Sequence, residues 1–171
     1  YFISTFFVNK TNLRTDEYGG CFPNKIRIAT EIVEGIRKSV GEDFLIIFRI
    51  PAMDMLEGGM SWEEICTLGQ ALENSGVSIV STHFSWHESP VPTIATMVPR
   101  AAFTSVTKRL KSVINVPVIT SNRINMPDVA ETVLANGDAD LVSMARPFLA
   151  DGKIFEKIKD GREDEINTCI A

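Results

Sequence analysis

Four short apolar segments recur along the chain, and longer segments with a helical pattern separate them. They read "FLIIFRI", "VSIVST", "VPVITSN" and "ADLVSMAR", and they cover Phe44–Ile50, Val77–Thr82, Val116–Asn122 and Ala139–Arg146. The segments are rich in β-branched residues and do not alternate with polar ones, which is typical of strands buried on both faces. We therefore predict four strands of a parallel sheet.

Helix signals lie between these segments. The segment Asn24–Val40 has apolar residues at helical spacing and is followed by Gly41, a residue that commonly ends helices. Ser61 and Glu64 have the spacing of a capping box and precede a second helix, which we expect to end at Gly76. Three further helices are predicted, at Phe103–Ser112, from Pro127 to about Gly137, and at Asp151–Lys159.

This alternation of helices and strands with short loops predicts a parallel α/β sheet with right-handed crossovers. The strands begin at intervals of roughly 25–40 residues, which is consistent with a TIM (β/α)8 barrel of ~250 residues. Four strands are half of such a barrel, and an open four-stranded α/β sheet is the alternative. No "GxGxxG" or "GxxxxGK" sequence follows a predicted strand, which argues against Rossmann and P-loop folds. Residues 1–171 are expected to form one structural unit.

Composition narrows the class of protein. The formal net charge is −5 and no basic run is present, which argues against a nucleic-acid surface. No apolar stretch approaches the roughly 20 residues that a membrane span needs. The three cysteines are far apart and odd in number, as expected for the reducing cytoplasm. Because the sequence opens on Tyr1 rather than Met, we expect it to be part of a longer chain or a trimmed one.

Arginines end three of the four predicted strands. They are Arg49, Arg123 and Arg146. In parallel α/β proteins the functional site lies at the carboxyl ends of the strands, and an arginine there needs an anionic ligand or a salt bridge. Barrels often bind phosphate after strands seven and eight, so Arg123 and Arg146 would flank such a site if theirs are the last two strands.

His87 follows the second strand, in the sequence "FSWHESPVPTIAT". Trp86 and the prolines Pro90 and Pro92 would hold its ring in place, which favours a functional role over that of a surface-loop histidine. His83 is expected to fill space. Cys169 alone is no metal motif, because iron–sulfur clusters need several cysteines at short spacing.

Several of these motifs resemble those of a known family. The sequences "NLRTDEYGG", "NKIRIATEIVEGIRKSVG" and "SMARPFLADG" resemble the Old Yellow Enzyme family of FMN-binding barrels. The sequences "SWHESPVPTIATMVPRAAF", "TSNRIN" and "DEINTCI" are more specific and resemble its bacterial-type NADPH-dependent 2,4-dienoyl-CoA reductases. The likeness runs from Tyr1 to Ala171 and implies the C-terminal half of the barrel, ending at the first cysteine of an iron–sulfur motif.

The resemblance also implies cofactors. Arg49 would lie near the flavin ring, and Arg123 with the Ala145-Arg146 turn would hold the FMN phosphate. NADPH would reduce an FAD in a separate later domain, and electrons would reach FMN through a 4Fe–4S cluster with Cys169 as its first ligand. The reaction would reduce a 2,4-dienoyl-CoA thioester in fatty-acid β-oxidation.

The same resemblance implies roles around the substrate. Tyr1 would donate a proton to the substrate carbon, and His87 would hydrogen-bond the thioester oxygen as charge develops there. The path of the acyl-CoA would be lined by Lys10, Glu88, Ser89 and Pro90.

Three departures from the family pattern stand out: His83 replaces a usual glycine, while Pro23 and Lys25 replace the glutamate and arginine of an "ENR" motif. A related FMN enone or enoate reductase and a non-catalytic half-barrel module remain alternative functions. The 171-residue piece is expected to lack turnover. It should pair with the N-terminal half of its barrel, with a C-terminal FAD/NADPH domain, or with itself, or else fold poorly, because it exposes sheet edges and apolar surface.

Overall fold

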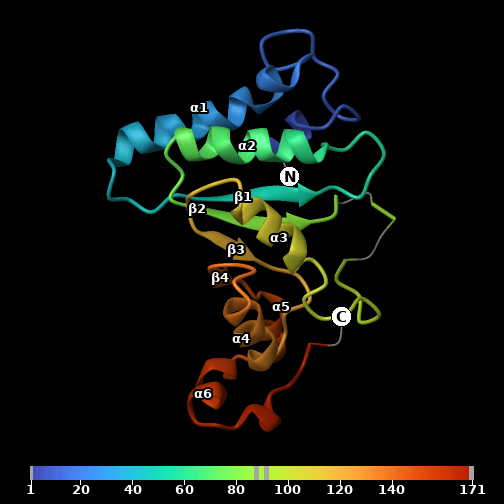
Figure 1. Ribbon diagram of the computed structural model, residues 1–171, viewed down its shortest axis with the longest axis vertical. Helices are drawn as coiled ribbons and strands as arrows, with labels where there is room; N and C mark the ends of the chain where they lie inside the picture. Colours follow the sequence, from blue (N-terminus) through green and yellow to red (C-terminus); the bar gives the residue numbers. More distant parts are fainter. Residues whose placement is uncertain (1, 87–88, 91–92, 170–171) are drawn as a thin grey trace.

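The computed structural model describes residues 2–86, 89–90 and 93–169, and its centre is a four-stranded parallel sheet (Figure 1). The strands are β1 (Ile47–Met53), β2 (Ile79–Phe84), β3 (Val118–Thr120) and β4 (Leu141–Val142). Their spatial order, β1-β2-β3-β4, follows their order in the chain. A doubly wound sheet reverses direction at a switch point, whereas a TIM barrel does not. The prediction of a partial barrel is therefore confirmed over the open-sheet alternative.

The helices follow the predicted pattern with small shifts at their ends. The longer ones are α1 (Phe22–Val40), α2 (Trp62–Asn74), α3 (Thr104–Lys111) and α4 (Pro127–Ala135). The capping box of α2 is present: the Glu64 N–H donates to Ser61 Oγ at 3.2 Å, and the Ser61 N–H donates to Glu64 Oε2 at 2.9 Å. Gly41 ends α1 with a φ of 80°, a left-handed conformation that favours glycine.

The structure corrects the prediction near the end of the chain. The single helix predicted at Asp151–Lys159 is α6 (Ile154–Lys159), and α5 (Arg146–Ala150) precedes it. Asp151 lies between the two helices, where its Oδ1 accepts the Lys153 N–H at 3.0 Å and so makes a turn. Two short 3-10 helices were not predicted, η1 (Ile3–Phe6) and η2 (Glu163–Glu165).

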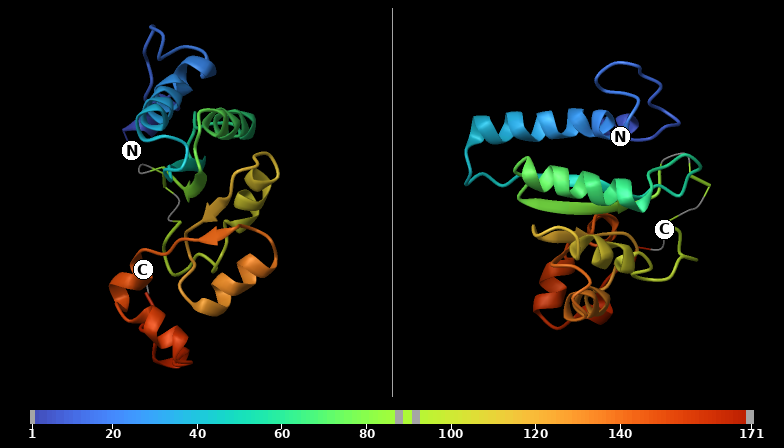
Figure 2. Two further views of the ribbon diagram at one scale, coloured as in Figure 1. Left: turned by 90° about the vertical axis from the view of Figure 1, so that its left-hand side faces the viewer. Right: turned by 45° about the horizontal axis from the view of Figure 1, so that its top comes forward.

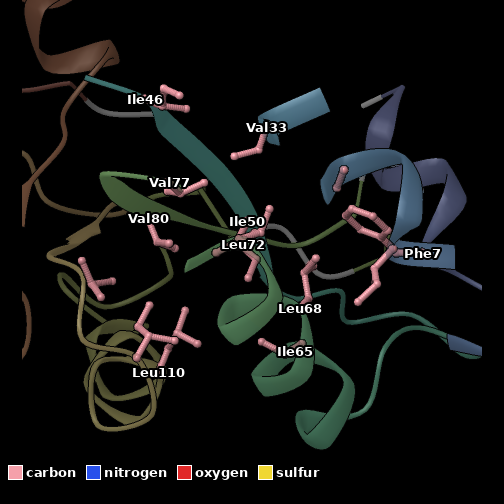
Figure 3. Packing of buried hydrophobic residues seen from close by; sticks show 14 of the residues in the cluster. Phe7, Val33, Ile46, Ile50, Ile65, Leu68, Leu72, Val77, Val80 and Leu110 are labelled. Carbon is pink, nitrogen blue, oxygen red and sulfur yellow. The ribbon is translucent and has the colours of Figure 1, made fainter. Parts of the chain in front are cut away.

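The main core lies between the sheet and helices α2 and α3, and it continues to α1 and to Phe7 and Val8 (Figures 2 and 3). Ile50, Val80 and Val118, from three neighbouring strands, are fully buried on this side. They pack in one cluster with the fully buried Leu68, Leu72 and Leu110 of the helices. Burying each such side chain stabilises the fold by about 1.5–3 kcal/mol before the entropy cost is subtracted.

The other face of the sheet carries the alternate residues of each strand. In the strand register Arg49 lies opposite Ser81, Ser81 opposite Ile119, and Ile119 opposite Leu141. We call this the inner face, because in a closed barrel it would surround the axis. Ile47 and Leu141 on this face are 49% and 43% exposed, so it is not packed against a layer of the described chain.

Candidate functional site

A cavity of about 260 Å³ opens on the inner face at the carboxyl ends of the strands. Its lining includes the four predicted cofactor residues: Arg49, Arg123, Ala145 and Arg146. Ser81, Ser121 and Ser143 also line it. None of the described residues that line the cavity is an aspartate or a glutamate. We call this space the arginine cavity. Its charge would suit an anionic ligand, because three arginines and no described carboxylate line one space.

The backbone around Arg123 is strained. Asn122 and Arg123, in the loop that follows β3, have φ values of 67° and 57°. Residues other than glycine rarely adopt this left-handed backbone conformation, which costs on the order of 1–3 kcal/mol for each residue. Such strain is concentrated at functional sites, where the surrounding structure compensates for it.

Backbone carbonyls of the segment Thr93–Val98 hold the arginine side chains. Arg123 is 8% exposed, and its Nε donates to the Val98 carbonyl at 2.8 Å while Nη2 donates to that of Thr96 at 3.3 Å. Nη1 of Arg146, from the first turn of α5, donates to the Ile94 carbonyl at 3.4 Å. These neutral acceptors position the guanidinium groups without neutralising them.

The sequence left open whether the strand-end arginines form structural salt bridges instead of binding a ligand. In the described part of the chain, neither Arg49 nor Arg123 has a carboxylate partner within salt-bridge distance. Arg49 is exposed on the inner face, and Arg123 is buried with only carbonyl partners. A structural ion pair therefore does not explain these two arginines.

A second, larger cavity of about 590 Å³ runs along β1, and Arg49 lines both cavities. Most of its lining is apolar, with Phe2, Phe7 and Phe48 among its residues. His83 projects into this cavity from the end of β2. Burial lowers the pKa of His83 to about 4, and the positive charge of Arg49 adds to the effect, so the imidazole is neutral at neutral pH. We call this space the β1 cavity.

The predicted substrate residues lie at several places. Ser89 is half-buried, and its Oγ donates to the Met55 carbonyl at 2.8 Å. Pro90 and Lys10 are exposed, and Lys10 is not among the residues that line either cavity. Tyr1, His87 and Glu88 lie outside the described residues. The roles given to these residues stay predictions.

Cys169 lies in the tail after η2 and is half-buried. Its carbonyl accepts a hydrogen bond from Asn125 Nδ2 at 3.3 Å. No three His, Cys, Asp or Glu side chains converge on a possible metal site within the part of the chain that the structure describes. The role of Cys169 as a cluster ligand stays a prediction. In the same part of the chain, no helix has the length and apolar character that a membrane span requires.

Sequence reasoning missed the segment Thr93–Val98 as a component of the site. Besides the carbonyls that hold the arginines, Thr93 Oγ1 accepts a hydrogen bond from Asn122 Nδ2 at 3.2 Å. The segment contains no charged or titratable side chain, so it offered no chemical signal. Its cues were the proline at each end, Pro92 and Pro99, which is typical of a braced loop, and its place within the motif "SWHESPVPTIATMVPRAAF".

The sequential parallel sheet defines part of a barrel, and the arginine cavity lies at its carboxyl end. The chain belongs to the NADH:flavin oxidoreductase / NADH oxidase family, whose model matches residues 1–165. The resemblance to flavin-dependent barrels is therefore confirmed at the level of the family.

Three known proteins show how far the similarity extends. The chain is 38% identical to a metal reductase of Desulforamulus reducens over its whole length, which is 26% of that protein. It matches the structure of 2-naphthoyl-CoA reductase in complex with 2-naphthoyl-CoA with a TM-score of 0.94 and 35% identity, over 99% of this chain and 26% of that one. An old yellow enzyme homologue from Zymomonas mobilis shares the fold, with a TM-score of 0.72 and 20% identity over 94% of this chain and 44% of the homologue.

The chain spans about a quarter of the length of the metal reductase and of the naphthoyl-CoA reductase. The matched family supports a flavin oxidoreductase. The names of these three relatives do not include a dienoyl-CoA substrate.

Proposed function

We propose that this chain is the FMN-binding part of an oxidoreductase that reduces an unsaturated acyl-CoA thioester, of the 2,4-dienoyl-CoA type. The observation that carries the proposal is the convergence of Arg49, Arg123 and Arg146 on one cavity that no described carboxylate lines. The 0.94 TM-score with 2-naphthoyl-CoA reductase supports a CoA thioester as the substrate class.

The residues of the arginine cavity fit FMN. Arg123 and Arg146 lie at two neighbouring strand ends, where guanidinium groups would bind the phosphate. Ala145 precedes α5 and would add backbone donors there. Arg49 lies two strands away on the same face, where its charge would stabilise electron density on the ring. When bound, FMN would supply the hydride that reduces the substrate.

In this proposal the loops after β1 and β2 form the substrate side of the site. The Trp86 N–H donates to the Asp54 carbonyl at 2.9 Å, and Ser89 Oγ donates to the Met55 carbonyl, so the two loops are joined. This junction would fix the segment that contains His87. His87 would then hydrogen-bond the thioester oxygen, and Tyr1 would protonate the substrate carbon. Lys10, Glu88, Ser89 and Pro90 would line the path of the CoA.

The complete protein would contain further parts. Cys169 would be the first ligand of a 4Fe–4S cluster, which would pass electrons from NADPH and FAD in a separate domain. The exposed Phe44, Leu45 and Ile47 would be covered by the N-terminal half of the barrel, as would the apolar part of the β1 cavity away from Arg49 and His83. The length of the relatives, about four times that of this chain, supports both additions.

Purification and assay of the full-length protein test the proposal. We expect bound FMN, with NADPH-dependent reduction of a 2,4-dienoyl-CoA and no oxidation of NADPH with the saturated acyl-CoA of the same length. A simple enone such as cyclohexenone separates the dienoyl-CoA assignment from the enone reductase alternative. Faster turnover of the enone would favour the alternative, and absence of FMN from the pure protein would refute a flavin enzyme altogether.

A further inference from the structure

His83 occupies a specific place in the fold that the assignments above do not use. It is the last inward-facing residue of β2, because Thr82 and Phe84 on either side of it are buried toward the helices. In the strand register it lies opposite Pro51, two residues further along the strands than the pair Arg49 and Ser81. The side chain therefore lies at the carboxyl end of the sheet, on the face that forms the arginine cavity.

The imidazole of His83 is half-buried and has no hydrogen-bond partner among the described residues. The described side-chain atoms that are both fully buried and unpartnered are Asp54 Oδ1 and Asn125 Oδ1, so the ring nitrogens of His83 still reach open space. That space is the β1 cavity, which Arg49 also lines. A half-buried imidazole usually has a partner, because an unmade hydrogen bond costs free energy.

The charge state of the ring limits which ligand it can recognise. Burial and the neighbouring Arg49 lower the pKa of His83 to about 4, so the ring is uncharged at neutral pH. A neutral imidazole has one N–H donor and one nitrogen acceptor. This pair complements the alternating carbonyl and N–H groups at the polar edge of a flavin ring better than it complements a phosphate.

We propose that His83 is a cofactor-contacting residue of this protein, which hydrogen-bonds the ring of the bound flavin from the end of β2, beside Arg49. The proposal rests on the proposed function, because it requires FMN in the adjoining cavity. It gives Arg49 and His83 different tasks: the guanidinium supplies charge, and the imidazole supplies a directional neutral hydrogen bond.

Two substitutions in the full-length protein test this contact. His83→Phe keeps a flat ring of similar size and removes both hydrogen-bonding nitrogens. His83→Asn replaces the imidazole with an amide, which also offers one acceptor and N–H donors. Each apo-protein is titrated with FMN by fluorescence quenching, and the visible spectrum of the bound flavin is recorded. Circular dichroism shows whether each variant is folded.

We expect His83→Phe to weaken FMN binding by about three- to tenfold, as the loss of one neutral hydrogen bond would. The absorption maxima of the bound flavin should shift, and His83→Asn should largely restore both the affinity and the spectrum. A residue that only fills space would leave the spectrum unchanged in the Phe variant. An affinity within twofold of wild type together with an unchanged spectrum would overturn the proposal.

The controls separate this proposal from the one on which it rests. If the wild-type protein does not bind FMN, both proposals fail. If the wild type binds FMN and the folded His83→Phe protein binds it identically, only the role of His83 fails. If the Phe variant does not fold, His83→Ala takes its place, because it also removes both ring nitrogens, and the same criteria of affinity and spectrum apply to it.

Discussion

The two faces of the sheet differ in almost every physical property. On the helix-facing side, three strands contribute fully buried aliphatic residues to one core. Even the polar groups there are paired: Thr107 Oγ1 lies 3.1 Å from Thr82 Oγ1 and 3.0 Å from Thr120 Oγ1, and all three residues are fully buried. On the inner face, half-exposed aliphatic residues lie beside Arg49 and His83, neither of which has a hydrogen-bond partner among the described residues.

This contrast indicates that the two faces serve different purposes. On the helix-facing side the buried residues find their partners within the chain, so their contacts stabilise the fold. The inner face leaves cationic and polar groups without protein partners and accepts strained backbone at Asn122 and Arg123. Such features cost stability and are retained where a ligand or another layer completes the contacts. Substitutions on the first face should therefore lower stability, and those on the second should lower ligand affinity.

The largest effect is expected on the helix-facing side. Leu110→Ala in α3 removes a fully buried side chain from the main core (Figure 3). The lost burial and the remaining cavity should lower the free energy of unfolding by about 2–5 kcal/mol. Urea unfolding of the full-length protein measures this change. Leu149→Ala is the matched control, because Leu149 is 85% exposed and its loss should cost less than about 0.5 kcal/mol. If the two substitutions lowered the free energy of unfolding equally, the helix-facing side would not be the main source of stability.

An intermediate effect is expected at the carboxyl end of the inner face. Arg123→Ala removes a buried guanidinium from the arginine cavity. Loss of a charged hydrogen bond to phosphate, at about 1.5–3 kcal/mol, should raise the Kd for FMN roughly 10- to 100-fold. Arg123→Lys should recover little of this affinity, because lysine lacks the planar fork that Val98 and Thr96 position.

Arg100→Ala is the control for Arg123, since Arg100 is exposed and lies outside the lining of the arginine cavity. FMN titration by isothermal calorimetry compares the two variants, and differential scanning calorimetry records their stability. If Arg100→Ala weakens FMN as much as Arg123→Ala does, the cavity does not select its ligand through specific guanidinium groups.

Much of the helix-facing side could be predicted from the sequence, because its signals are local. The capping box of Ser61 and Glu64 marked the start of α2, and β-branched runs marked all four strands. The extent of the strands was overestimated: β4 covers only Leu141–Val142, although the apolar run is longer. The length of a strand depends on hydrogen bonds with its neighbours, and β3 offers only three residues for pairing.

Less of the inner face could be predicted. The arginines were visible because charge at the end of an apolar strand is conspicuous, and the structure does bring them together. The left-handed backbone of Asn122 and Arg123 and the carbonyls that position Arg123 depend on tertiary contacts with the segment Thr93–Val98. None of the residue types in that segment predicts this role. His83 was interpreted as a space-filling residue because its missing partner becomes evident only in three dimensions.

The smallest effect is expected at Asp151, which lies between α5 and α6 and contacts the tail that contains Cys169. Asp151 Oδ2 accepts hydrogen bonds from Lys157 Nζ at 2.6 Å and from the Asn167 N–H at 3.0 Å. The hydrogen bond from Lys157 and those from the two backbone N–H groups lower the pKa of Asp151 to about 2. Because this pKa is lower in the folded state than the unfolded value of about 3.9, the carboxylate stabilises the fold above pH 4. That stabilisation should be lost as the pH falls from about 4 to 2.

Comparison of wild type with Asp151→Asn isolates this contribution, since both keep a side chain of the same shape. The difference between their apparent melting temperatures should be constant from pH 5 to 7 and should shrink below pH 4. FMN affinity at pH 7 should be the same in both proteins, because Asp151 does not line the arginine cavity. A melting-temperature difference that grows at low pH would show that the Asp151 carboxylate does not stabilise the fold in the way its lowered pKa predicts. A loss of FMN affinity would show that the tail and the inner face are coupled, so that stability and ligand binding are not separated in this part of the molecule.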